Sequence, residues 1–177
     1  MISLLVMQGC MRLIGEGAEA GLGPSGKYYE NKMVAPSKDR TALADYRNME
    51  LVEFKNEYGQ NVPNDFLRAF PIEFRRHAEG AGLLNPGGKT IGFKVAVIHY
   101  ETADMTDNVF GPLEQAVARV EMIDKDTGRV LATGNALGRT GKTVGLGPEK
   151  KAVGLAKALL KWVEDYSPKK TKDQDRG

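Results

Sequence analysis

The stretch from Ala136 to Thr143 joins glycines to a Lys-Thr pair, the residue types that cradle a phosphate in a P-loop. It reads ALGRTGKT and fits the relaxed P-loop pattern, with Ala136 in place of the first glycine. A P-loop begins its helix at the Lys-Thr pair, so that the helix N-terminus and the backbone amides surround the phosphate. Here Gly147 and Pro148 delay the next helix by about one loop. We therefore predict that Lys142 is not a phosphate ligand, and nucleotide or phosphate handling by residues 136–143 is the alternative function.

Cys10 carries the only thiol of the chain, which excludes an intramolecular disulfide and a cysteine-based metal cage. It follows the apolar run MISLLVMQG, which is too short to cross a bilayer because a span takes about 20 residues. The small residue Gly9 stands directly before Cys10, as at the cleavage site of a secretory signal. Two interpretations are open: a signal that is cut before Cys10, or an apolar N-terminal strand that buries the thiol as a small hydrophobic group.

Two other patterns resemble binding loops but fit structural roles better. Residues 21–26, GLGPSG, have the spacing of a dinucleotide fingerprint, yet no strand pattern precedes them and no helix pattern follows. Asp124 and Asp126 could begin a calcium loop, but Gly128 occupies a ligand position and Asn135 stands where a bidentate Glu belongs. We expect residues 124–128 to close a hairpin instead, since Gly128 can adopt the left-handed conformation.

The two histidines, His77 and His99, are not spaced with carboxylates as a metal site or a catalytic triad requires. Their expected roles are structural. The sequence therefore predicts no catalytic residue, no cofactor and no bound metal, and we expect the protein not to be an enzyme.

The composition is that of an ordinary globular chain, with 41% hydrophobic and 27% charged residues among 177. Lys and Arg number 25 against 23 Asp and Glu, which gives a net charge of +2. A dedicated nucleic-acid-binding protein normally has a larger and more clustered excess of positive charge, so no nucleic-acid partner is expected. The length suits one compact domain with additional terminal segments.

Hydrophobic periodicity predicts two helices and four strands. A helix over 64–79 has apolar residues at helical spacing, and Pro71 within it predicts a kink or a broken turn. A second helix, about 148–166, starts with Pro148 and carries one apolar stripe. Alternating patterns predict strands at 49–54, 90–102, 116–123 and 129–133.

These elements predict an α+β fold in the order β-α-β-β-β-α, with two layers: a mostly antiparallel sheet of about four strands and two helices on one of its faces. We expect a truncated signal at 1–10, a flexible tether and irregular arm at 11–44, one domain at 45–167 and a disordered tail at 168–177. We expect the apolar stripe of the second helix to pack on the sheet in the core. Its residues Leu155, Leu159 and Val163 should face Val95, Val97 and Val120 of two strands.

The pair Gly9-Cys10 after an apolar stretch resembles the lipobox of bacterial lipoproteins. Residues 45–166 are similar to a family of uncharacterised envelope lipoproteins, on the basis of Val62-Pro63 before a helix, the turn DKDTG at 124–128 and the Ala-rich final helix. The resemblance implies that Cys10 is lipidated and becomes the first residue of the mature protein. It further implies a small domain without enzyme activity that is anchored through its lipid and faces the periplasm, at the outer rather than the inner membrane. A partner protein of the envelope would then be its binding target.

Overall fold

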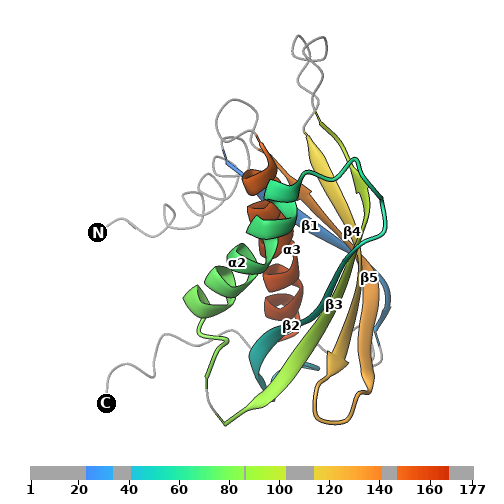
Figure 1. Cartoon of the computed structure of the whole chain (residues 1–177). Helices are drawn as coiled ribbons and strands as arrows, with labels where there is room; N and C mark the ends of the chain where they lie inside the picture. Colours follow the sequence, from blue (N-terminus) through green and yellow to red (C-terminus); the bar gives the residue numbers. More distant parts are fainter. Residues whose placement is uncertain (1–22, 34–40, 86, 103–113, 141–146, 168–177) are drawn as a thin grey trace, which may run out of the picture.

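The computed structural model describes residues 23–33, 41–85, 87–102, 114–140 and 147–167 (Figure 1). Two helices and five strands follow one another within these described segments. They are β1 (Ser25–Met33), β2 (Tyr46–Asn56), α2 (Asn64–Gly80), β3 (Lys89–Tyr100), β4 (Gln115–Asp124), β5 (Val130–Arg139) and α3 (Pro148–Asp165). The fold class is α+β, as predicted, with each expected element present and one strand added at the start.

The five strands form one sheet in the order β1-β5-β4-β3-β2. Three neighbouring pairs are antiparallel, whereas β2 and β3 run parallel. The expected sheet of about four mostly antiparallel strands is thus corrected to a mixed sheet of five. The parallel pair arises because α2 connects β2 to β3 as a crossover, which returns the chain to the same end of the sheet.

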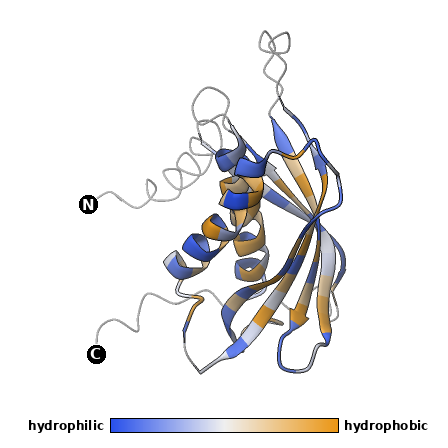
Figure 2. Ribbon diagram, viewed as in Figure 1, coloured by the Kyte–Doolittle hydropathy of each residue, from blue (hydrophilic) through white to orange (hydrophobic). Residues whose placement is uncertain are grey.

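Both helices cover the same face of the sheet, as Figure 1 shows, and the core lies between the two layers. Apolar residues concentrate on the facing sides of helices and strands in Figure 2. The predicted helix-on-sheet core is confirmed, because all six of its residues are at most 1% exposed and belong to one cluster: Leu155, Leu159, Val163, Val95, Val97 and Val120.

Strand β1 lies in the region for which the sequence predicted a tether and an irregular arm, 11–44. It pairs antiparallel with β5 and contributes one large aromatic to the core side, where Tyr28 stacks on Trp162 with ring centroids 5.0 Å apart. Lys27, Tyr29 and Lys32 point to the uncovered side of the sheet, as their register positions indicate. A strand with so few apolar residues gives almost no alternating signal, so the expectation for this segment was wrong.

Two elements continue further than the sequence predicted. Strand β5 does not end at Thr133 but runs on to Arg139, and small residues fill its core-facing positions. Helix α2 continues through Pro71, where a kink or a broken turn was expected. Proline removes a single backbone donor. Phe66 and Phe70, both fully buried, hold this part of the helix on the sheet.

Candidate functional site

The glycine-rich half of the P-loop-like stretch lies in strand β5, directly beneath helix α3. A Cβ atom on Gly138 would lie 2.5 Å from the backbone nitrogen of Leu155, and one on Gly154 would lie 2.5 Å from the carbonyl oxygen of Ser25. On the neighbouring strand, a Cβ on Gly26 would lie 2.5 Å from the backbone nitrogen of Ala158. No side chain fits between these backbones. The glycines therefore let α3 pack on β1 and β5 at backbone contact distance.

This packing assigns a structural role to part of the sequence that resembled a phosphate-binding loop. Ala136–Arg139 forms hydrogen-bonded ladders with β1 on one side and β4 on the other. A P-loop needs these residues in a loop whose amides face the phosphate. Lys142 and Thr143 lie outside the described residues, so the expectation that Lys142 does not bind phosphate stays a prediction.

A buried lysine occupies the first turns of α3, at the end of the sheet where β3 and β4 meet. Lys151 is 1% exposed, and its Nζ atom lies 2.9 Å from Oε2 of Glu114. The same ammonium donates a hydrogen bond to the carbonyl of Glu101 and lies 4.1 Å from the ring centroid of Tyr100. A carboxylate, a carbonyl and an aromatic face thus surround one cation, as a buried charge requires.

The electrostatics of this cluster favour a structural role. Burial lowers the pKa of the Lys151 ammonium, and the carboxylate of Glu114 opposes that shift. Burial also raises the pKa of Tyr100, and the negative charge of Glu114 adds to the effect. The Tyr100 hydroxyl is buried and has no hydrogen-bond partner among the described residues. These groups join α3 to the ends of β3 and β4.

The turn at 124–128 closes the β4–β5 hairpin, as predicted. The amide of Gly128 donates to the carbonyl of Asp124 at 2.7 Å, and Gly128 has a positive φ of 69°. One carboxylate oxygen of Asp124 accepts the amides of Asp126 and Thr127, and the other accepts the hydroxyl of Tyr46 at 2.7 Å. Because its oxygens are occupied by the turn and by Tyr46, Asp124 serves as a fold-stabilising carboxylate.

The two histidines lie in separate environments. Burial lowers the pKa of His77 near the end of α2, and the positive charge of Lys157 reinforces this shift. His99 lies on β3, with its Nε2 atom 3.0 Å from Oε1 of Glu101. No group of three His, Cys, Asp or Glu side chains converges as a metal site would require, within the part of the chain that the structure describes.

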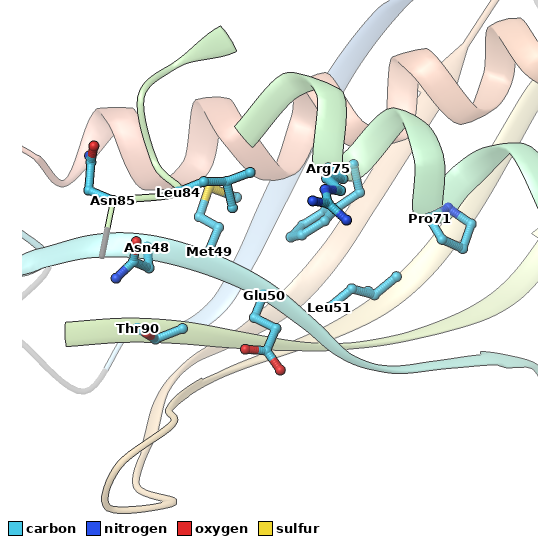
Figure 3. A pocket seen from close by; sticks show the side chains of 10 residues that line it. Asn48, Met49, Glu50, Leu51, Pro71, Arg75, Leu84, Asn85 and Thr90 are labelled. Carbon is cyan, nitrogen blue, oxygen red and sulfur yellow. The ribbon is translucent and has the colours of Figure 1, made fainter. Parts of the chain in front are cut away.

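A groove of about 640 Å³ separates helix α2 from strand β2 (Figure 3). Pro71 and Arg75 border it from α2, Met49 and Leu51 border it from β2, and Leu84 closes one end. The groove runs along the outermost strand of the sheet. Its walls combine apolar and polar side chains with the edge of a strand.

Sequence reasoning did not identify this groove. Its walls come from segments that are far apart in the sequence, so no local pattern marks it. The residue that the sequence did single out, Cys10, lies outside the described residues. No helix in the described part of the chain is both long and apolar enough to span a membrane.

No family model matches the chain, and no curated protein matches it. The fold is similar to that of PelC from Paraburkholderia phytofirmans, which was solved as a dodecamer in two crystal forms. One structure matches with a TM-score of 0.50 and 15% sequence identity, over 82% of this chain and 98% of PelC. The other matches with a TM-score of 0.50 and 17% identity, over 81% of this chain and 99% of PelC. At this level of identity the similarity concerns the fold alone.

Proposed function

We propose that the chain is a lipid-anchored domain of the bacterial cell envelope with a non-catalytic, structural role. The observation that carries the proposal is the pair Gly9-Cys10 at the end of an apolar run, followed by a glycine-rich stretch before the folded domain. The Cys10 thiol would receive a diacylglyceryl group, and the preceding residues would be removed. The domain would then face the periplasm, at the outer membrane.

The energetics of anchoring support this arrangement. Each buried CH₂ group of an acyl chain contributes about 0.8 kcal/mol, and stable anchoring takes more than one chain. A diacylglyceryl group on Cys10 supplies two acyl chains. If the glycine-rich stretch between Cys10 and β1 acts as a flexible linker, it would let the domain reach a partner without a fixed orientation.

The fold and its polar clusters support a structural rather than a catalytic role. The glycines that resembled a phosphate loop pack against α3, and the buried lysine holds α3 to the sheet. The PelC structures of similar fold are dodecamers, which favours a role as a subunit within an assembly. The groove beside β2 offers an open strand edge and apolar side chains for such a contact.

Labelling with palmitate tests the proposal. The gene is expressed from its own chromosomal locus in bacteria fed radiolabelled palmitate, and the protein is recovered by immunoprecipitation. We expect label in the wild-type protein and none in Cys10→Ser. A Lys150→Gln chain is the matched control, because this exposed residue of α3 is 140 positions away from Cys10 in the sequence. Unlabelled wild type, or label retained in Cys10→Ser, would contradict the proposal.

A further inference from the structure

Exposed large apolar side chains of the described residues lie at the two opposite edges of the sheet. At the β2 edge, Val52 of β2 is 44% exposed, and Leu84, which is bridged to Asn48 of β2, is 39% exposed. Tyr29, which is 54% exposed, lies on β1 at the other edge. Each edge of the sheet therefore presents apolar surface to solvent.

We propose that the groove beside β2 accepts strand β1 of a second copy of the chain, so that the sheets of neighbouring copies continue head to tail. The proposal builds on the structural role proposed above but not on the lipid anchor. It identifies the partner as the chain itself and the contact as β1 of one copy against β2 of the next.

The backbone of both edges is open to such pairing. The first part of β2 is covered, because the amide of Met49 donates to the carbonyl of Leu83 at 2.9 Å. From Glu50 to Asn56 the strand pairs only with β3, within the part of the chain that the structure describes. Among the described residues, strand β1 likewise pairs only with β5, so its other edge is open. A strand edge with free amides and carbonyls is a template for the addition of another strand.

The strand directions fit this contact without any rearrangement. Strand β2 is parallel to β3, and the three remaining pairs across the sheet are antiparallel, so β1 runs opposite to β2. If neighbouring copies are related by a rotation about an axis parallel to the strands, each strand keeps its direction in every copy. Strand β1 of one copy would therefore meet β2 of the next antiparallel, which is the geometry that short strand pairs adopt most readily.

The charges of the two edges are complementary. Lys27 and Lys32 of β1 are exposed and lie on the uncovered face of the sheet. Glu50 and Glu53 of β2 lie on that same face, beside Gly92 and Lys94 of β3. In a continued sheet, two lysines of one copy would lie next to two glutamates of its neighbour, and opposite charges on adjacent strands stabilise the pair.

A second copy would cover the exposed apolar surface at both edges of the sheet. An unrelated peptide in the groove would cover only the β2 edge. The contact joins two different surfaces of the same chain, so each copy would donate one edge and receive at the other. Such a heterologous contact produces a closed ring when the rotation between copies closes, and an open filament when it does not.

Light scattering of the full chain tests whether copies associate through this edge. We expect the wild type to form an assembly of several chains, and Leu84→Glu in the wall of the groove to reduce the molar mass to that of one chain. Lys150→Gln changes the charge by the same amount at an exposed site on α3 and should leave the mass unchanged. Because Leu84 is 39% exposed, Leu84→Glu should keep the wild-type melting temperature, which would show that the fold is intact.

Chemical cross-linking tests which edges meet. In a Cys10→Ser background, Tyr29→Cys and Val52→Cys are made as separate chains and treated with a short bis-maleimide. We expect a mixture of the two chains to give a cross-linked dimer and neither chain alone to do so. A chain with both substitutions should give a ladder of higher species.

The outcomes separate this contact from the proposed structural role. An assembly whose mixed single-cysteine chains do not cross-link would overturn the edge contact and leave the structural role intact. Cross-links within Tyr29→Cys alone would show a symmetric β1–β1 contact and would also overturn it. A chain that is monomeric at every concentration would exclude a second copy, and the groove would then be open to a different partner.

Discussion

The hydroxyl of Tyr46, at the start of β2, donates a hydrogen bond to the carboxylate of Asp124 at 2.7 Å, across the end of the sheet. This bond, together with the amides of the hairpin turn, lowers the pKa of Asp124 to about 2. Burial and the same bond raise the pKa of Tyr46 to about 12. The two side chains link the β4–β5 hairpin to the first residue of β2.

The shifted pKa of Asp124 predicts a dependence of stability on pH. Its folded-state pKa lies below its ordinary value of 3.8, so its contribution is complete above about pH 4 and is lost as the pH falls towards 2. We expect Tyr46→Phe to lower the urea midpoint at pH 6, and the gap to wild type to narrow at pH 2.5. A gap of equal size at both pH values would contradict this role of the pair.

The contact of α3 with β5 predicts that Gly138 tolerates no side chain. A Cβ there would collide with the backbone of α3, so we expect Gly138→Ala to lower the free energy of unfolding by about 1–3 kcal/mol or more. Gly80→Ala is the matched control, because no atom lies within 4 Å of its Cβ position near the end of α2. Alanine favours helix, so that variant should gain up to about 1 kcal/mol. Equal effects in urea denaturation would refute the close packing.

The core between α3 and the sheet predicts a large effect at Leu159. This side chain is fully buried, so Leu159→Ala should cost about 2–5 kcal/mol in the free energy of unfolding. The adjacent Leu160 is only partly buried, and Leu160→Ala should cost clearly less. An unchanged denaturation midpoint for Leu159→Ala would remove α3 from the core.

Lys142 is predicted not to bind phosphate. Isothermal titration calorimetry of the wild type with ATP and Mg²⁺ should show no binding in the micromolar range. Micromolar binding that Lys142→Ala abolishes would contradict this prediction and would favour the alternative function of residues 136–143.

The elements with strong apolar periodicity could be predicted from the sequence, because burial of one face determines that periodicity. Helix α3 and strand β3 lie within a few residues of their predicted bounds for this reason. Strand β1 could not be predicted in the same way. Tyr28 is its one large side chain stacked in the core, and the positions facing the other way carry lysines and a tyrosine.

The roles of individual site residues depend on contacts between distant segments. Gly138 fits a phosphate loop and a helix contact equally well in the sequence, and the placement of α3 decides between them. The groove depends on how Leu84 and Met49 approach each other after α2 has crossed the sheet, which no local pattern encodes. The turn at Asp124 was predictable, because Asp and Gly close a hairpin through contacts within five residues.

The mass of the mature protein tests the lipid anchor most directly. The protein is extracted with detergent from bacterial envelopes after expression from its own chromosomal locus, and its N-terminal peptide is analysed by mass spectrometry. We predict a peptide that begins at Cys10 and carries the added mass of a diacylglyceryl group, with or without a further acyl chain. A peptide that contains residues before an unmodified Cys10 would contradict the account.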